Sequence, residues 1–470
     1  MAYTTIDKPT NHFNTKTYTG TGSNQSISSV GFQPDFVWIK DRTSANNNNL
    51  NDSVRGANKQ LYSDLQNAET TATTHLTSFD SDGFTLGNDG AVNTNTNKYV
   101  SWNWLGAGTS PSQTYTVKVV SDSGNKYRFD DFGTSAVTLD LQEGGTYTFD
   151  QSDSSNSGHP LRFSTTSDGT HNSGTEYTTG VTTTGTPGSS GAKTVITVAS
   201  SAPTLYYYCT QHSGMGGQAN TNSTHGSSNF GGTIQSNVSA NTTAGFSIVS
   251  YTGTTGGASS TIGHGLGVTP DLVILKPRSY VGAWWWAQKG RSDKVLELQA
   301  TNTEVDPSSS FGGGGLKYST FTSSVFGGTN GTSNDDLWNT NGATYIAYCF
   351  AEKKGFSKLF KYQGNGNTNG TMVHLGFKPA FIICRDPGNL ENWFIFDNKR
   401  DGINVNKVLL YANDSSGDTT SGANQIDLLS NGFKTRATNN GMNRNGATFI
   451  GFAFAENPFV TSGGIPCTAR

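Results

Sequence analysis

The chain is poor in charge and in long apolar segments. Only 14% of its 470 residues are charged, and 31 basic against 34 acidic residues give a net charge of −3. Ordinary globular domains have roughly 25% charged residues. A balanced charge offers no basic surface to a polynucleotide, so we expect no nucleic-acid partner. The apolar runs fall far short of the ~20 residues that cross a bilayer, so we expect no membrane insertion.

Cysteines, export signals and catalytic motifs are also scarce. The four cysteines, Cys209, Cys349, Cys384 and Cys467, are too sparse for a disulfide scaffold, which predicts free thiols. The N-terminal segment lacks the charged and apolar regions of a secretory signal, so no export by that route is expected. There is no nucleophile elbow, phosphate-binding loop or HExxH motif, and no pair of carboxylates stands out. We therefore expect no enzymatic activity.

Glycine, small polar residues and aromatic residues are abundant instead. The chain has 58 Gly but only 13 Pro and no G-X-Y period, which excludes collagen, and its 26 Phe, 18 Tyr and 8 Trp exclude a disordered chain. Short apolar runs alternate with Gly- and Asn-rich turns, and no helical period is sustained. This pattern predicts an all-β protein, with at most a short helix at residues 59–65.

Three copies of one two-part pattern organise the chain. Each copy opens with a Tyr-x-Gly turn and a proline that precedes a buried run of β-branched and aromatic residues. Each copy closes with large apolar residues in period-two alternation, which predicts a strand with one face buried. The copies open at Tyr18, Tyr251 and Tyr362, their prolines are Pro34, Pro270 and Pro379, and their closing strands lie at 99–104, 341–352 and 445–456.

The spacing of the prolines reveals an insertion. Pro270 and Pro379 are 109 residues apart, whereas Pro34 and Pro270 are 236 apart, so about 127 additional residues lie between the first two copies. We expect tandem β-sandwich or jelly-roll modules that each bury a core of their own, like beads on a string. The expected units are repeats at 1–110, 245–355 and 356–470, an inserted sandwich at 114–217 and a solvated linker at 218–244.

The inserted module carries the sharpest chemical pattern. An aromatic strand runs into a Gly-rich loop that presents Cys209, His212 and Met215 at C-x2-H-x2-M spacing, and His159 lies upstream. Two imidazoles, a thiolate and a weak axial thioether form the ligand set of a blue-copper centre. The segment resembles the cupredoxins, and its loop spacing is similar to that of the amicyanin-like members. The resemblance implies a cupredoxin-like sandwich over about 115–217, with copper held by these four residues.

Several of these residues also have a simpler interpretation. A cysteine that ends an aromatic strand is often only buried, and His and Met in a loop also occur as surface or packing residues. His171 is a further candidate ligand. Asp80 and Asp82 are either Ca²⁺ ligands or turn residues, and the tryptophans at 284–286 are either a platform for sugar rings or core residues. We favour the turn and the core.

The repeats carry a second resemblance. Its motifs are Gly-Phe-Gln-Pro-Asp-Phe-Val-Trp-Ile-Lys40, Asp52-Ser-Val-Arg-Gly56 and Ser78-Phe-Asp-Ser-Asp-Gly-Phe-Thr-Leu-Gly87 in the first copy, the closing segments from Tyr345 and Phe454, and the tail from Cys467. These motifs resemble a repeat of virion proteins of marine bacteriophages, and the closing segments are similar to those of tail-fibre-like proteins of cyanobacterial phages.

The phage resemblance implies a virion structural protein, either a tail fibre or appendage or a capsid decoration, with a role in host-surface attachment. The implied partners are other virion proteins and a host cell-surface glycan or receptor, and the implied assembly is a homo-oligomer, a trimer by analogy. Two other classes stay open: a copper-binding cupredoxin-type redox protein, and a glycan-binding adhesin or tailspike. The first class predicts that the chain binds copper stoichiometrically. The second class predicts that substitution of aromatic residues in the loops abolishes glycan binding.

Overall fold

The structure is a computed structural model that describes residues 4–254, 260–307, 315–329, 338–402 and 404–458. These residues form eight β-sheets, and their helices are single turns. The helical turns are η1 (Pro9–Asn11), α1 (Gly90–Asn93), η2 (Ser154–Asn156), η3 (Gly169–Asn172), η5 (Tyr318–Thr320) and α3 (Asn440–Asn443). The expected all-β fold is confirmed. Within the described ranges, no helix has the length and apolar character needed to span a membrane.

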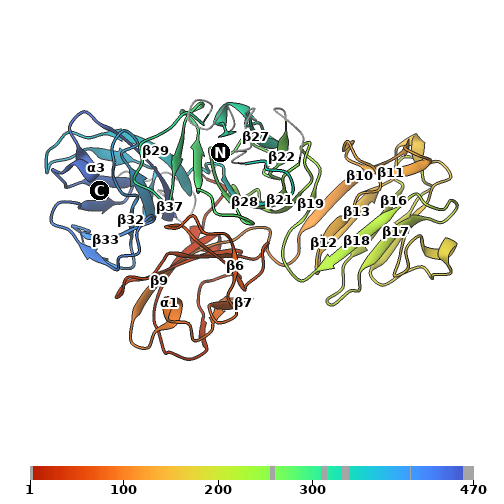
Figure 1. The fold of residues 1–470 in the computed structure, drawn as a ribbon, viewed down its shortest axis with the longest axis horizontal. Coiled ribbons are helices and arrows are strands. Elements are labelled where there is room, and N and C mark those ends of the chain that lie inside the picture. The colour runs from red at the N-terminus through yellow and green to blue at the C-terminus, as the bar shows by residue number, and fades with distance from the viewer. Residues whose placement is uncertain (1–3, 255–259, 308–314, 330–337, 403, 459–470) are drawn as a thin grey trace.

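Each repeat packs a large antiparallel sheet against a small three-stranded one (Figure 1). In the first repeat the large sheet is β1 (Phe13–Thr19), β9 (Lys98–Trp104), β3 (Phe36–Asp41), β4 (Asn49–Asp52), β5 (Lys59–Tyr62) and β6 (Thr70–Thr71), in that spatial order. The small sheet is β2 (Gln25–Ile27), β8 (Gly83–Leu86) and β7 (Leu76–Asp80).

The second and third repeats have the same strand order. In the second, the five equivalent strands are β21 (Phe246–Thr252), β28 (Thr344–Phe350), β23 (Leu272–Pro277), β24 (Trp285–Gln288) and β25 (Val295–Glu297). Two further strands, β20 (Ser236–Asn241) and β19 (Ser227–Asn229), extend this sheet beyond β21, and the small sheet is β22 (Thr261–Gly263), β27 (Val325–Thr329) and β26 (Gly315–Leu316). The third has β29 (Ser357–Gln363), β37 (Thr448–Pro458), β31 (Phe377–Arg385), β32 (Phe394–Asp397), β33 (Val408–Tyr411) and β34 (Thr419–Thr420), with β30 (Met372–His374), β36 (Gly432–Thr435) and β35 (Ile426–Leu429).

The proline-led strand of each repeat is buried on both faces. In β3, Val37 and Ile39 pack into the core between the large and the small sheet of the first repeat. Phe36 and Trp38 point the other way, into a second core that all three repeats share. An uninterrupted apolar run is the sequence signature of a strand with both faces covered, because alternate side chains then meet two apolar surfaces.

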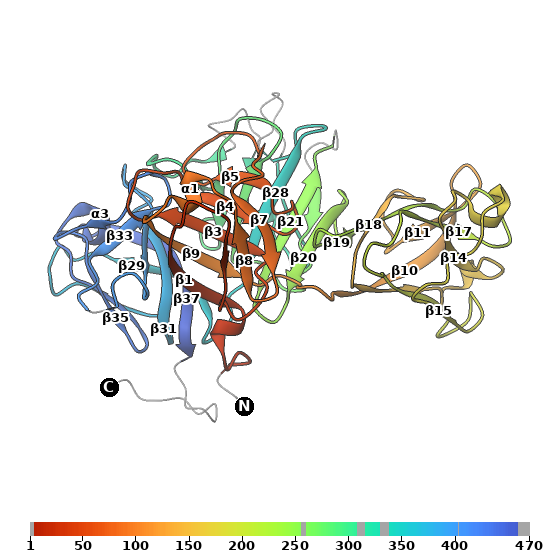
Figure 2. The same ribbon diagram turned by 90° about the horizontal axis from the view of Figure 1, so that it is seen from below.

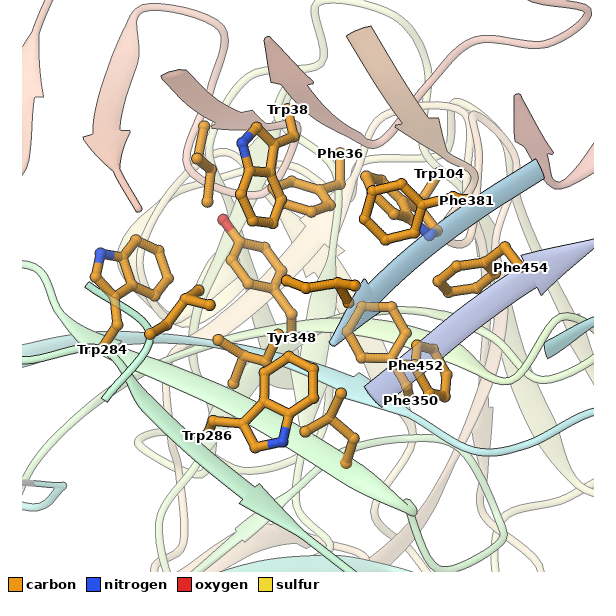
Figure 3. A pocket seen from close by; sticks show the side chains of 15 residues that line it. Phe36, Trp38, Trp104, Trp284, Trp286, Tyr348, Phe350, Phe381, Phe452 and Phe454 are labelled. Atoms are coloured by element: carbon orange, nitrogen blue, oxygen red, sulfur yellow. The ribbon is translucent and has the colours of Figure 1, made fainter. Parts of the chain in front are cut away.

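The shared core lies where the three large sheets meet (Figure 3). Phe36 of the first repeat stacks on Tyr348 of the second at 4.2 Å between ring centroids, and Phe350 of the second meets Phe452 of the third at 5.3 Å. The side chains leave a cavity of about 30 Å³ that is lined by apolar and aromatic residues of all three repeats. Each repeat has the expected core of its own between its two sheets. The expected beads-on-a-string arrangement is wrong, because the second face of each large sheet is also apolar and the other repeats bury it.

The three interfaces between repeats are equivalent. In each, a backbone N–H beyond the fifth strand of one repeat donates to a carbonyl just beyond the proline-led strand of the next. These bonds are Glu69 N to Arg278 O (2.8 Å), Glu304 N to Pro387 O (2.9 Å) and Asp418 N to Arg42 O (2.7 Å). They join the first repeat to the second, the second to the third and the third to the first. The body is thus a closed ring with pseudo-threefold symmetry.

The inserted module is a sandwich of two sheets that protrudes from the side of this body (Figure 2). One sheet is β11 (Asn125–Phe129), β10 (Ser112–Ser121), β13 (Thr146–Asp150), β16 (Lys193–Thr197) and β15 (Val181–Thr184). The other is β12 (Leu139–Gln142), β18 (Gly217–Asn222), β17 (Leu205–Cys209) and β14 (Leu161–Ser164).

Two local expectations are wrong. The stretch 218–244 is not a free linker, because it completes β18, forms β19 (Ser227–Asn229) and β20 (Ser236–Asn241), and places Phe230, which is 4% exposed, in the core of the insert. Polar side chains do not prevent a backbone from pairing, and Ile234 and Val238 anchor the segment in the core of the second repeat. Residues 59–65 begin with the strand β5 instead of a helix, because Leu61 is buried in the shared core.

Candidate metal centre

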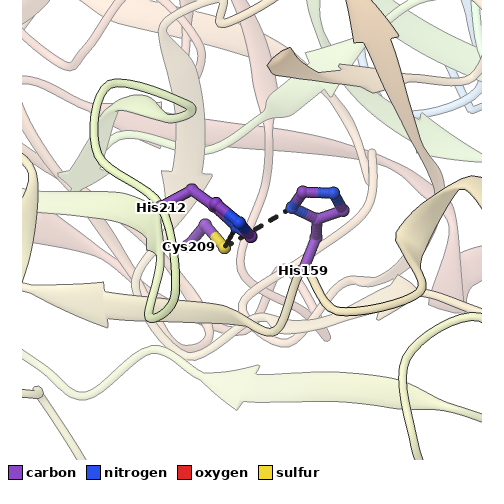
Figure 4. A group of neighbouring side chains, drawn as sticks. All are labelled: His159, Cys209 and His212. Atoms are coloured by element: carbon purple, nitrogen blue, oxygen red, sulfur yellow. Dashed lines mark hydrogen bonds between the residues drawn. The ribbon is translucent and has the colours of Figure 1, made fainter.

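Strand pairing in the insert brings the predicted ligands together. In the register of β14 with β17, Leu161 lies opposite Cys209, so His159, two residues before Leu161, comes beside the cysteine. His212 follows in the loop that leaves β17. Cys209 is buried, His159 is half-buried and His212 is exposed at the surface. The three side chains point toward one another (Figure 4).

The distances suit a single metal ion. The Cys209 sulfur lies 3.8 Å from Nδ1 of His159 and 3.7 Å from Nδ1 of His212. Metal–sulfur bonds of ~2.3 Å and metal–nitrogen bonds of ~2.0 Å at trigonal to tetrahedral angles separate the sulfur and the nitrogen by about 3.5–3.8 Å. A thiolate with two imidazoles is the donor set that suits copper. The residues therefore fit the metal that the sequence resemblance implies.

Met215 belongs to the same core as Cys209. Its side chain is 1% exposed and packs in the apolar interior of the insert. Its backbone carbonyl accepts a hydrogen bond from the backbone N–H of Tyr127 at 3.0 Å, which fixes the end of the ligand loop. The axial role of Met215 stays a prediction.

Residues around the ligands hold them in place. The carbonyl of His159 accepts hydrogen bonds from Tyr127 Oη at 2.9 Å and from Gln151 Nε2 at 2.8 Å. Burial, and after it the neighbouring His212, lowers the pKa of His159, which favours the neutral imidazole that binds metals. The roles of Tyr127 and Gln151 could not be predicted from the sequence, because both residues act through the backbone of His159.

His171 is not part of the group of ligand atoms. Its Nε2 is bonded to the backbone carbonyl of Cys209 at 2.9 Å, so it supports the strand end. The candidate centre lies at the end of the insert that is remote from the body. At the opposite end, Gln142 of β12 donates to the carbonyl of Gly108 in the connection to the first repeat, and β18 runs parallel to β12 toward that end.

The other candidates have structural roles. Asp80 accepts hydrogen bonds from Ser78 and Thr85, while Asp82 binds the backbone of the neighbouring loop, so each carboxylate has its own partners in a turn. The tryptophans at 284–286 are buried, so the core interpretation is confirmed and a sugar platform there is excluded. Cys209, Cys349 and Cys384 are free and buried, and Cys467 lies outside the described residues.

Comparison with known proteins finds one family. Its model matches residues 8–129 and 156–458, and its description is a domain of unknown function, DUF7483. The match spans all three repeats and the part of the insert that holds the candidate metal ligands. No curated protein and no solved structure matches the chain.

Proposed function

The chain belongs to the DUF7483 family, and from that starting point we propose that it is a structural protein of a bacteriophage particle. It is a tail appendage or a capsid decoration that takes part in attachment to the host surface, and its partners are other virion proteins and a host glycan or receptor. The proposal follows the resemblance of the repeat motifs. The structural observation that supports it best is the closed ring of three repeats around one core, with a separate domain held out at the side.

A ring of this kind suits a particle exterior. Exterior proteins must keep their fold through dilution and salt, and surface electrostatics contribute little there because charges are screened within ~3 Å at 1 M salt. Here the three repeats share an apolar core inside the ring, and only 14% of the residues of the chain are charged. Burial of an apolar surface does not depend on ionic strength in the way that surface ion pairs do.

Immuno-electron microscopy of purified particles tests this function. We expect an antibody against the full chain to label every particle, at the tail if the protein is an appendage and over the head if it is a decoration. Unlabelled particles, with the protein present only in the lysate of the infected host, contradict the proposal.

A second function is favoured by the metal-centre geometry: the insert is a copper-binding domain. Cys209 ends β17, His159 lies two residues before β14, and Tyr127 and Gln151 bind the carbonyl of His159, so these two ligands are positioned by the fold of the insert. The buried sulfur is shielded from solvent, and His212 gives the centre access to the surface. A bound copper ion would supply one-electron transfer.

Titration of the full chain with Cu(II) tests the copper function. We expect one equivalent to produce strong visible absorption at about 600 nm, as a thiolate–copper centre does. Cys209→Ser removes the band, whereas Cys349→Ala, which removes a different buried thiol, keeps it. An absent band, or a band that survives in Cys209→Ser, contradicts copper binding at this centre.

A further inference from the structure

The pseudo-threefold symmetry extends to buried cations between the repeats. Lys40, Lys276 and Arg385 are at equivalent places at the ends of β3, β23 and β31, and all three are fully buried. Each donates to a backbone carbonyl four residues beyond the fifth strand of a neighbouring repeat. The bonds are Lys276 Nζ to Gln66 O (3.2 Å), Arg385 Nη2 to Thr301 O (3.0 Å) and Lys40 Nζ to Ser415 O (2.8 Å).

A second set of three hydrogen bonds between the repeats follows the same pseudo-threefold symmetry. The residue before the fourth strand of each repeat donates from its side chain to the last carbonyl of the fifth strand of a neighbour. The bonds are Trp284 Nε1 to Tyr62 O (2.7 Å), Trp393 Nε1 to Glu297 O (3.0 Å) and Asn48 Nδ2 to Tyr411 O (3.1 Å). The backbone bonds, the bonds of the buried cations and these side-chain bonds all link the first repeat with the second, the second with the third and the third with the first. The arrangement of the repeats is therefore equivalent to that of the subunits in a closed homotrimer.

One end of this ring presents three equivalent apolar tips. Ala45, Val281 and Leu390 each lie five residues beyond the buried cation, in the loop that leads to the fourth strand. Val281 is 68% and Leu390 is 69% exposed, and Ala45 is also exposed. In the described part of the chain only five large apolar side chains are well exposed, and these two occupy matching positions.

The tips face away from the end where the insert is attached. In the antiparallel register, Phe36 at the start of β3 lies opposite Trp104 at the end of β9, and the chain leaves Trp104 toward the insert. The loop beyond Asp41 is therefore at the other end of the sheet. A partner can contact all three tips without meeting the insert.

We propose that these three tips dock one chain onto a homotrimeric protein of the particle, with the pseudo-threefold axis on the threefold axis of the partner. Ala45, Val281 and Leu390 then enter three identical apolar sites, one on each partner subunit. Three weak contacts on one rigid body bind together far more tightly than one contact does. The homotrimer implied by the phage resemblance is replaced by one chain, so each partner trimer carries a single insert. This inference rests on the proposed virion function.

Cross-linking on purified particles tests this docking. Three variants, Ala45→Cys, Val281→Cys and Leu390→Cys, are assembled into particles one at a time and treated with a linker that reacts with thiols at one end and is photoactivated at the other. We expect all three positions to link to the same segment of the same particle protein. Met372→Cys, another exposed apolar position (41% exposed) on the small sheet of the third repeat, is the control and should not reach that segment.

The outcomes separate this inference from the proposed function. Links from the three tips to three different segments, or from one tip only, overturn the docking while the protein remains a particle component. Particles that contain no chain at all contradict the virion function itself. Light scattering of the free chain adds a second check: we expect the 49.9 kDa mass of one chain, and a stable homotrimer overturns the inference.

Discussion

At the scale of single residues, the glycine of each Tyr-x-Gly opening is fixed by a close backbone approach. A Cβ on Gly364 would lie 2.2 Å from the carbonyl oxygen of Arg444, and the equivalent glycines of the other repeats, Gly20 and Gly253, have the same clearance. We expect Gly364→Ala to lower the free energy of unfolding by about 1–3 kcal/mol, because the backbone must shift to admit a methyl group. Thermal denaturation measures the effect. Gly422→Ala in the same repeat, where a Cβ meets nothing within 4 Å, is the control and should be neutral.

The buried amine of Lys276 makes stability depend on pH. Burial, together with the charge of nearby Arg55, lowers the pKa of Lys276 from 10.5 to about 7. Between these values the unfolded chain binds a proton that the folded chain lacks, so stability rises with pH across this interval and is lowest below pH 7. We expect the melting temperature to rise between pH 6.5 and 9, and to rise less in Lys276→Met. If the exposed Lys361→Met flattens the profile equally, the assignment to Lys276 is wrong.

At the scale of elements, one carboxylate ties the insert to the first repeat. Asp35 is fully buried and accepts hydrogen bonds from the backbone N–H groups of Gly106 and Gly108, in the segment that leaves the repeat. It also pairs with His225, in the segment that returns from the insert. Both connections between the two modules therefore meet on one side chain.

We expect Asp35→Ala to loosen this joint without unfolding either module, because each keeps its own core. The unpaired N–H groups and His225 then favour an open, hydrated connection. Limited proteolysis measures the change: cleavage within 105–113 or 222–227 should become faster. The control is Asp271→Ala, the equivalent residue of the second repeat, whose side chain binds Lys289 and the backbone of Glu352 within its own repeat. Equal proteolysis of the two variants contradicts a special role for Asp35.

Some strands could be predicted from the sequence and others could not. The uninterrupted proline-led runs predicted the strands β3, β23 and β31, and the alternating closing segments predicted β9, β28 and β37, because burial leaves a pattern of apolar residues in the sequence. The spacing of Cys209, His212 and Met215 predicted the candidate site, and the structure brings the cysteine together with both histidines. The polar strands β18 to β20 were missed because backbone pairing needs no particular side chain. The shared core was not predicted, because an apolar strand pattern in the sequence does not show which other sheet packs against that face.

At the scale of the whole molecule, the shared core decides how the protein unfolds. No repeat can leave the ring without exposing the second face of its own large sheet and of both neighbours, so the three repeats form one cooperative unit. The insert has a core of its own, built around Phe163 and other buried aromatic residues. Calorimetry should therefore resolve two transitions, one for the ring and one for the insert, where independent beads would give four.

A matched pair of substitutions assigns the two transitions. Trp393 is fully buried in the shared core and donates to Glu297 of the second repeat, so Trp393→Ala should destabilise the ring by about 3–5 kcal/mol and lower its transition as a single peak. Phe163→Ala, inside the insert, should lower only the other transition. The cooperative ring is contradicted if, in Trp393→Ala, the third repeat unfolds in a separate transition at lower temperature while the first two repeats keep their original transition. In that event each repeat carries its own stability, and the contacts that close the ring are too weak to couple them.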